Sequence, residues 1–278
     1  MKREFYRSYI ERFGKEFTDK MNEKINSPYT QYLRVNTSKI APEKLFLRLT
    51  KKGFVLEKQK ELDYCFKVLK KPFALSSTEE YLLGYLYLQD KASMISVNEL
   101  NPKPDELVLD SCSAPGGKST LLSQLMKNEG AIISIDQKAE RLKAQLFNIQ
   151  RLGCINIASY KMDALKVKRL GLMFDKIFLD APCSATGMMW KQKKRIKSVN
   201  KHEVRMHAML QKKLIKSCYD VLKKGGLMVY STCSIEAEEN EENVEYAESL
   251  GFEKIKEKQF FPQIDDTIGF FYALLKKL

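Results

Sequence analysis

The sequence is poor in histidine and tryptophan and contains no paired cysteine motif. Only two histidines, His202 and His207, and one tryptophan, Trp190, occur among 278 residues. The six cysteines form no C-x-x-C pair and no Cys/His cluster, so we expect no metal site, and histidine-based nucleophilic catalysis has few candidates. A chain of this size does not require a disulfide scaffold, and unpaired thiols indicate a reducing, cytoplasmic setting.

Long apolar stretches are also lacking. No segment approaches the ~18 uninterrupted apolar residues of a membrane span, and the N-terminus has no apolar core of a secretory signal. We therefore expect no membrane association. Hydrophobic residues make up 44% and charged residues 30% of the chain, a globular composition with enough apolar surface for a sizeable core.

Acidic residues are outnumbered, and the formal net charge is +13. Such an excess favours a polyanionic partner such as a nucleic acid. The segment 188–216 holds ten basic residues, among them Lys193, Lys194 and Arg195, and one acidic residue. The segment 235–250 instead holds seven glutamates, which we interpret as a solvated helix start favoured by the helix dipole.

The first hundred residues indicate a helix followed by a small α+β module. Aromatic and apolar residues from Tyr6 to Met21 recur every three or four positions, which predicts one amphipathic helix ending before Asn26-Ser27-Pro28. Residues 31–75 then alternate strand-like runs with one helical stretch. The proline-rich segment Asn101–Pro104 is the best linker, so we expect domains over 1–104 and 105–278.

Beyond the linker, short apolar runs alternate with helical stretches, which is typical of an α/β fold with a doubly wound, mostly parallel sheet. A long helix is predicted over His202–Lys223, stopped by Gly225-Gly226 before the strand Leu227–Ser231.

Four carboxylates and three cysteines follow the predicted strands. Ligands in an open parallel sheet bind beyond the carboxyl ends of the strands. The residues at those ends are Asp110, Asp136, Asp163 and Asp180, together with the Cys-Ser pairs that begin at Cys112, Cys183 and Cys233. One such aspartate is an ordinary helix cap, but the whole set predicts a binding site at one edge of the sheet.

The turn SCSAPGGKS resembles two phosphate-binding motifs and matches neither. The first glycine of a P-loop would fall on Cys112, and the dinucleotide fingerprint G-x-G-x-x-G is not matched because the turn has only the adjacent pair Gly116-Gly117. Asp136 lies 20 residues after Gly116, the separation expected of a carboxylate that binds ribose hydroxyls. A nucleoside cofactor without pyrophosphate, such as S-adenosylmethionine, fits this pattern better than a nucleoside triphosphate or NAD.

Three segments, VLDSCSAPGGKS, DAPCSATGM and YSTCSIEAEENEENV, resemble the signature motifs of the Sun/Nop type RNA cytosine-5 methyltransferases, and LRVNT, LQDKAS and GFFYALLKK extend the likeness. The resemblance implies a Rossmann-like, S-adenosylmethionine-dependent methyltransferase sheet preceded by a small RNA-recognition-like α+β module. It implies methylation of RNA at cytosine C5, with tRNA as the expected substrate. The alternatives are rRNA as substrate, or an idle RNA-binding assembly factor.

The resemblance also implies roles for residues. Cytosine C5 becomes nucleophilic only after a thiolate adds to C6. Residue chemistry does not choose between Cys183 and Cys233 for that addition; the family pattern assigns it to Cys233, with Cys183 assisting release and Asp180 and Lys118 completing the catalytic set. The cofactor would contact Cys112, Ser113, Ala114, Pro115, Gly116, Gly117, Lys118, Asp136, Asp163 and Asp180. The target base must leave the stack, and Trp190 is either a stacking platform for it or a core residue.

Overall fold

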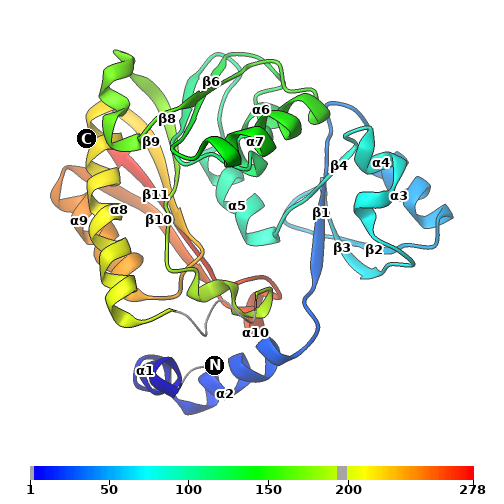
Figure 1. Cartoon of the computed structure of the whole chain (residues 1–278), viewed down its shortest axis with the longest axis horizontal. Helices are drawn as coiled ribbons and strands as arrows, with labels where there is room; N and C mark the ends of the chain where they lie inside the picture. The colour runs from blue at the N-terminus through cyan, green and yellow to red at the C-terminus, as the bar shows by residue number, and fades with distance from the viewer. Residues whose placement is uncertain (1–2, 193–198) are drawn as a thin grey trace.

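The computed structural model describes residues 3–192 and 199–278 and shows a large α/β body beside a smaller antiparallel module (Figure 1). Seven strands form the large sheet in the order β10-β11-β9-β8-β5-β6-β7. The central strands β5 to β9 run parallel, and β11 and β10 add antiparallel strands at one edge. Their bounds are β5 Leu107–Asp110, β6 Ala131–Asp136, β7 Ile157–Lys161, β8 Phe174–Asp180, β9 Leu222–Thr232, β10 Phe252–Phe260 and β11 Phe270–Lys277.

Helices cover both faces of this sheet, so its parallel strands are buried on both sides. On one face lie α5 (Lys91–Leu100), α6 (Gly117–Leu125) and α7 (Ala139–Leu152); on the other lie α8 (Lys201–Val221), α9 (Glu241–Ser249) and the 3₁₀ turn η2 (Ala164–Leu170). Successive strand residues serve opposite faces: Val108 packs with α5 and α6, and Leu109 with the α8 side. The predicted Rossmann-like fold is confirmed.

The small module is the predicted antiparallel α+β unit. Its sheet has the order β2-β3-β1-β4, with strands β1 Gln31–Val35, β2 Val55–Lys58, β3 Cys65–Lys70 and β4 Leu86–Leu88. Two helices, α3 (Pro42–Lys51) and α4 (Glu79–Leu82), and the turn η1 (Leu75–Ser77) complete it. Thr78 caps α4 by accepting the Tyr81 N–H at 3.1 Å.

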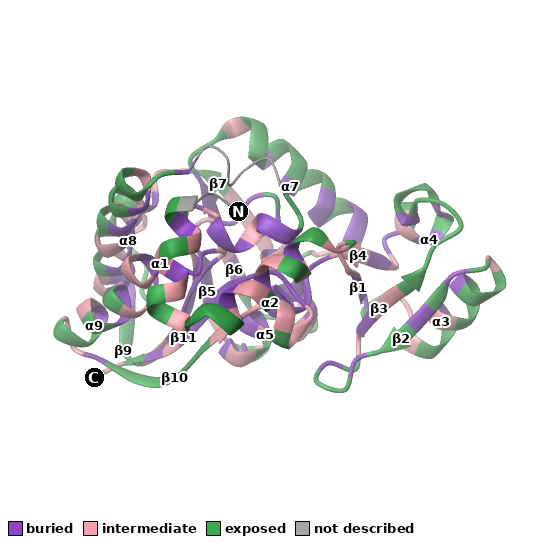
Figure 2. Cartoon of the chain, turned by 90° about the horizontal axis from the view of Figure 1, so that it is seen from below, coloured by how far each residue is buried: buried purple, intermediate pink, exposed green. Residues whose placement is uncertain are grey.

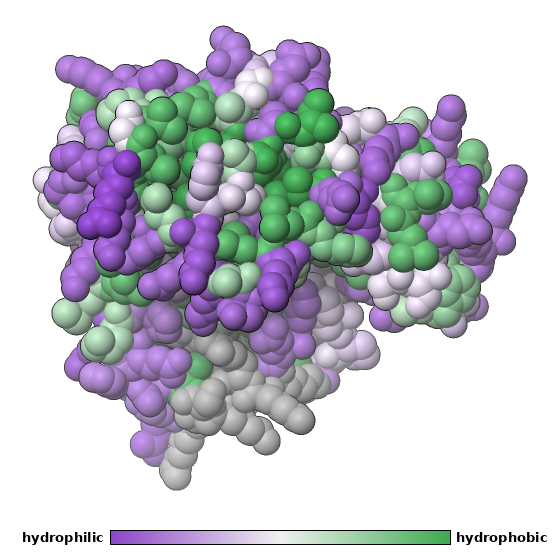
Figure 3. Space-filling model, turned by 45° about the horizontal axis from the view of Figure 1, so that its top comes forward, coloured by the Kyte–Doolittle hydropathy of each residue, from purple (hydrophilic) through white to green (hydrophobic). Residues whose placement is uncertain are grey.

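Burial and surface chemistry separate the two parts of the molecule. Figure 2 shows buried residues concentrated in the large sheet and at the inner faces of its helices, whereas the outer faces of α3, α4 and α8 are exposed. In the space-filling view the small module forms a separate lobe, and the larger body carries an apolar area surrounded by hydrophilic side chains (Figure 3).

The N-terminal segment is two helices rather than the single one that the periodicity predicts. Helix α1 (Arg3–Phe13) and helix α2 (Lys15–Asn26) are separated by Gly14, whose φ of 85° is a left-handed conformation that glycine adopts without strain. The apolar periodicity continues through the break because Phe13 and Phe17 both pack on Phe261.

Trp190 is a core residue of this N-terminal contact and not a stacking platform. It lies in the turn η3 (Thr186–Trp190), is only 1% exposed, and donates its indole N–H to the Ser27 carbonyl at 3.2 Å. The Lys24 ammonium lies 4.4 Å from the ring centroid, and Tyr29 packs edge-on at 5.2 Å. No face of the indole is open to a nucleobase. The basic residues Lys193, Lys194 and Arg195 lie outside the described residues.

The glycine pair after α8 has a different role from the predicted one. Helix α8 ends at Val221 and β9 begins at Leu222, so Gly225 and Gly226 lie inside the strand. They occupy a bulge in the β8–β9 pairing, where the register passes from Phe174↔Leu222 to Lys176↔Leu227. A bulge needs residues that tolerate unusual backbone angles, and Gly225 has a φ of 76°.

Asp266 ties the small module and α2 to the large body. From the loop before β11, its carboxylate forms ion pairs with Lys24 at 2.6 Å and Lys67 at 2.7 Å. The Asp266 carbonyl accepts the Tyr32 hydroxyl at 2.7 Å. Burial alone would raise the pKa of Asp266, but hydrogen bonds from Lys24 and Lys67 hold it below its ordinary value of 3.8.

Asp266→Asn should lower the free energy of unfolding at pH 7 by about 1 kcal/mol, a magnitude typical of partly exposed ion pairs. The pKa of Asp266 is lower in the folded than in the unfolded protein, so the ionised carboxylate stabilises the fold. This contribution to the free energy of unfolding is fully present above the unfolded-state pKa and is lost as the pH falls through the folded-state pKa. Urea unfolding of both proteins at several pH values should therefore give curves that converge below pH 3.8. A difference independent of pH would contradict the ion-pair explanation.

Trp190→Ala should reduce the free energy of unfolding by roughly 3–5 kcal/mol, since a large buried side chain is replaced by a cavity. Urea unfolding followed by circular dichroism measures this loss, and Trp190→Phe, which refills most of the space, serves as the matched variant. Loss of nucleic-acid binding with unchanged stability would instead restore the stacking role.

Candidate active site at the carboxyl edge of the large sheet

The predicted strand-end aspartates do meet at one edge of the sheet. Asp110, Asp136 and Asp180 are the last residues of β5, β6 and β8, and Asp163 follows β7 by two residues. Because these four strands are parallel neighbours, their carboxyl ends lie side by side. The edge therefore collects carboxylates from four separate segments of the chain.

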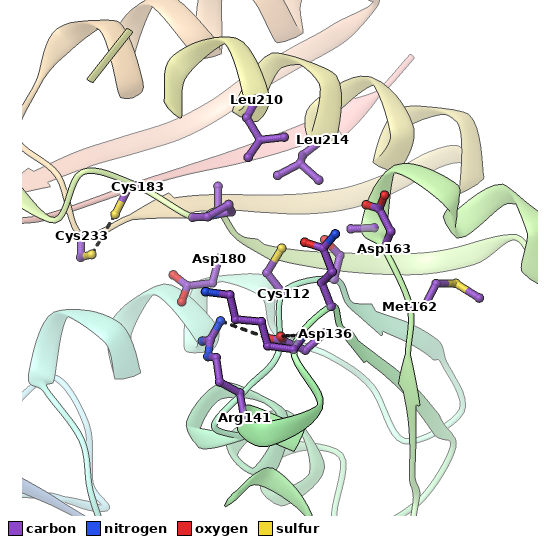
Figure 4. Close-up of a pocket in the computed structure, with 16 residues that line it drawn as sticks. Cys112, Asp136, Arg141, Met162, Asp163, Asp180, Cys183, Leu210, Leu214 and Cys233 are labelled. Carbon is purple, nitrogen blue, oxygen red and sulfur yellow. Dashed lines mark hydrogen bonds and ion pairs between the residues drawn. The ribbon is translucent and has the colours of Figure 1, made fainter. Parts of the chain in front are cut away.

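A pocket of about 340 Å³ lies along this edge. Figure 4 shows the two thiols of Cys183 and Cys233 at one end, Asp163 and Met162 at the other, and Asp180 between the thiols and Asp136. Apolar side chains from α8, Leu210 and Leu214, form the opposite wall. The six predicted residues that line the pocket are Cys112, Asp136, Asp163, Asp180, Cys183 and Cys233.

Asp136 is buried, with 4% of its surface accessible. Its carboxylate accepts the Ala114 N–H at 3.2 Å and the Lys138 N–H at 3.0 Å, and it pairs with Arg141 at 3.2 Å. Arg141 also donates to the Ala114 carbonyl. Asp136 thus fixes the turn after β5 at the same time as it faces the pocket.

The glycine turn supports the pocket mainly from its backbone. Of residues 112–118, Cys112 alone lines the pocket in the described part of the chain. Gly116, with a φ of 95°, is the N-cap residue before α6, and a Cβ at Gly117 would lie 2.9 Å from the Tyr87 ring. These two positions require glycine because of a left-handed backbone and a close contact.

Arg34 of β1 holds this turn from the small module. It is buried, and its guanidinium donates to the Gly117 carbonyl at 2.8 Å and to the Thr120 hydroxyl at 2.9 Å. Asn36, two residues later, donates to the Leu152 carbonyl at 2.8 Å. The LRVNT segment therefore joins the small module to the glycine turn at the start of α6. Sequence reasoning did not find this function, although the polar residues inside an apolar strand were a signal.

Lys118 and Asp180 form a partly buried ion pair beside the thiols. Their charged atoms are 2.6 Å apart, and the other Asp180 oxygen accepts the Ser231 hydroxyl at 3.0 Å. Burial by itself would lower the pKa of Lys118, but the charges of Asp180, Asp110 and Cys233 raise it above its ordinary value. Lys118 is therefore a cation at neutral pH, pointing into the site as the resemblance implies.

Cys183 and Cys233 are brought together, with their sulfur atoms 2.8 Å apart. Both are free thiols; Cys183 is buried and Cys233 is partly exposed. The hydrogen bond to Cys233, burial, and the negative charges of Glu239 and Asp180 all raise the pKa of Cys183. The two thiols thus occupy different environments despite their contact.

Cys65, Cys154 and Cys218 lie outside this pocket. Burial raises the pKa of Cys218 to about 12 and also raises that of the other two. They are therefore weakly reactive thiols that serve as small apolar residues.

The acidic segment after Cys233 is not simply a solvated helix start. Glu239 is fully buried and Glu236 is 7% exposed, and burial raises the pKa of Glu236 to about 7. Glu236 accepts the Tyr9 hydroxyl of α1. The sequence pattern did not distinguish these two glutamates from their exposed neighbours.

Within the described residues, no group of three or more His, Cys, Asp or Glu side chains is arranged to hold a metal ion. Nor does any helix in residues 3–192 and 199–278 have the length and apolar content needed to cross a membrane.

Residues 97–276 match the model of the family described as 16S rRNA methyltransferase RsmB/F. The chain is 37% identical over 224 residues to a tRNA (cytosine(72)-C(5))-methyltransferase of Pyrococcus horikoshii, a match covering 74% of this chain and 56% of that protein. It is 37% identical over 232 residues to a 28S rRNA (cytosine(4447)-C(5))-methyltransferase of Homo sapiens, covering 73% and 29%. The chain thus spans at most about half the length of these relatives.

The crystal structure of NSun6 from Pyrococcus horikoshii with SFG is similar over nearly all of both chains. The TM-score is 0.94 at 28% sequence identity, and the match covers 99% of this chain and 98% of the other. The likeness therefore includes the small module and the N-terminal helices as well as the large sheet.

Proposed function

This chain belongs to the 16S rRNA methyltransferase RsmB/F family, and from that membership and the geometry of the pocket we propose that it methylates cytosine C5 in RNA with S-adenosylmethionine as methyl donor. The observation that carries the proposal is the pair of thiols 2.8 Å apart beside the Lys118–Asp180 ion pair. An assembly factor without activity would have no need of this arrangement.

The far end of the pocket suits a nucleoside cofactor. The Asp136 carboxylate faces the pocket with its orientation fixed, as an acceptor for ribose hydroxyls must be, and Met162 and Leu214 offer apolar surface to an adenine ring. Three aspartates line the pocket, a poor environment for a nucleoside triphosphate. The structurally similar NSun6 was crystallised with SFG, an S-adenosylmethionine analogue.

The thiol end of the pocket suits the base. We assign to Cys233 the attack on C6, because it is the more exposed thiol of the pair and lines the same pocket as Asp180. Asp180, held by Lys118 and Ser231, would contact the N3 edge of the ring and support the addition.

Cys233 would act through a temporary covalent bond to the ring. Its thiolate adds to C6, and the displaced electron pair is taken up with a proton at N3, which leaves an enamine with a nucleophilic C5. Bound S-adenosylmethionine would supply the methyl group that bonds to C5 and would leave as S-adenosylhomocysteine. A base then removes the C5 proton, the C5–C6 double bond re-forms, and the Cys233 thiolate leaves. Cys183, in contact with the Cys233 sulfur, is placed to assist this last step.

We propose tRNA as the substrate class and the cytoplasm as the site of action. The similar tRNA enzyme of Pyrococcus horikoshii supports tRNA, and the rRNA enzymes in the same set of relatives make rRNA the alternative. Residues 1–104 would contact the RNA, and residues 105–278 would carry out the chemistry. Bisulfite sequencing of RNA from cells with and without the gene identifies the modified cytosine; its absence from every RNA would contradict the activity.

Asp136→Asn should weaken S-adenosylmethionine binding about 10- to 100-fold, because a hydrogen bond to a charged acceptor contributes about 1.5–3 kcal/mol. The asparagine keeps the size of the side chain, which matters because Asp136 also holds the Ala114 turn. Isothermal titration calorimetry measures the affinity. The control is Glu140→Gln, which changes an exposed carboxylate in the first turn of α7. Unchanged affinity would remove Asp136 from the cofactor site.

The two cysteines should fail in different ways when substituted. Cys233→Ala cannot form the adduct, so neither product nor a covalent complex is expected. Cys183→Ala should still add and methylate, but release should stall and leave a protein–RNA complex that survives a denaturing gel. Circular dichroism checks that both variants fold. The reverse pattern, an adduct in Cys233→Ala and none in Cys183→Ala, would reassign the nucleophile.

A further inference from the structure

Glu239 is a buried carboxylate that no part of the proposed mechanism uses. It ends the short turn η5 (Ala237–Glu239), is 0% exposed, and pairs with no lysine or arginine in the described part of the chain. A buried charge without a counter-ion is costly unless hydrogen bonds compensate for its lost hydration. Its contacts therefore indicate what it does.

The Glu239 carboxylate holds the two residues that flank Cys183. One oxygen accepts the Ser184 N–H at 2.8 Å and the Gln211 side-chain amide at 3.1 Å. The other oxygen accepts the Ser184 hydroxyl. The same Gln211 amide donates to the Pro182 carbonyl at 2.9 Å. The backbone is thus fixed immediately before and immediately after the thiol.

Three other elements keep Glu239 itself in place. The Tyr230 hydroxyl of β9 donates to the Glu239 carbonyl at 2.5 Å, and the Asn243 amide of α9 donates to Tyr230 at 3.1 Å. Asn243 also donates to the Gln211 side-chain carbonyl of α8 at 2.7 Å. All four side chains are buried. The network therefore links α8, α9 and β9 by hydrogen bonds to the loop that carries Cys183.

Cys233 has no direct contact with the Glu239 carboxylate, which comes nearest to it through Ser184, whose hydroxyl lies 3.4 Å from that of Ser234. The Cys233 carbonyl accepts the Gly187 N–H at 3.0 Å, and the Gly187 carbonyl accepts the Gly269 N–H at 2.9 Å. None of the Glu239 carboxylate bonds reaches Cys233. Disturbing Glu239 should consequently affect the Cys183 loop first.

We propose that Glu239 is a positioning residue for Cys183, which fixes that thiol against the Cys233 sulfur for the release half of the reaction. The proposal rests on the proposed methyltransferase function. It predicts that loss of Glu239 reproduces the defect of losing Cys183, in which methyl transfer proceeds and adduct resolution does not.

Glu239→Ala is expected to slow steady-state turnover roughly 10- to 100-fold, because misplacing a reacting group by about 1 Å costs on this order. Single-turnover methylation should stay within about threefold of wild type, and the covalent protein–RNA complex should accumulate. Glu239→Gln keeps the size and one oxygen acceptor, so it should recover most of the turnover. Glu242→Ala, which removes an exposed glutamate of the same segment, is the matched control.

A double substitution separates positioning from general loss of structure. If Glu239 acts through Cys183, adding Glu239→Ala to Cys183→Ala should cause no further loss of turnover. Additive losses, or equal losses of single-turnover and steady-state rates in Glu239→Gln with an unchanged Tm, would overturn the proposal. If the wild-type protein itself gave neither product nor adduct, the proposed methyltransferase function would fail. That result differs from a failure of the Glu239 proposal, in which the wild-type protein is active.

Discussion

The parallel pairing of β8 with β9 is the constraint on which the site depends. Its register sets Asp180 opposite Ser231, and each strand is followed within three residues by a cysteine. The pairing alone therefore places the Cys183 and Cys233 loops side by side, and Ser231 can donate to Asp180 across the strands. A one-residue slip would turn these side chains to opposite faces of the sheet. The thiol contact is a consequence of strand register.

Buried polar groups around the site favour fixed geometry over stability. Asp110 is fully buried with one oxygen lacking a hydrogen-bond partner in the described residues, and burial raises its pKa to about 7. Glu239 is buried with no counter-ion among the described residues, and Lys118 forms a partly buried ion pair with Asp180. Apolar replacements at such positions are often neutral or stabilising. Polar side chains at these positions fix one orientation through their hydrogen bonds, which apolar side chains do not.

The small module contributes to the same site through its contacts with the large body. Arg34 reaches the start of α6, whereas Asp266 returns from the loop before β11 to α2 and β3. That loop also touches the Cys183 segment, since Gly269 donates to the Gly187 carbonyl. The small module, the glycine turn before α6 and the Cys183 segment are thus connected through hydrogen bonds and ion pairs.

The sequence by itself determined the parallel sheet, the strands that carry the aspartates and the two candidate thiols, because strand-helix alternation and strand-end residues are local patterns. The spacing from the glycine turn to Asp136 also led to the prediction of a cofactor site there, and the structure places Asp136 in the pocket beside that turn. The tertiary structure alone decided that Trp190 is enclosed, that Asp136 is a buried anchor, and that Glu239 differs from neighbouring glutamates. Each of these depends on contacts between segments distant along the chain, such as Arg34 with Gly117 or Ser184 with Glu239. Propensity and periodicity carry no information about such contacts, because only the order and register of the strands bring those segments together.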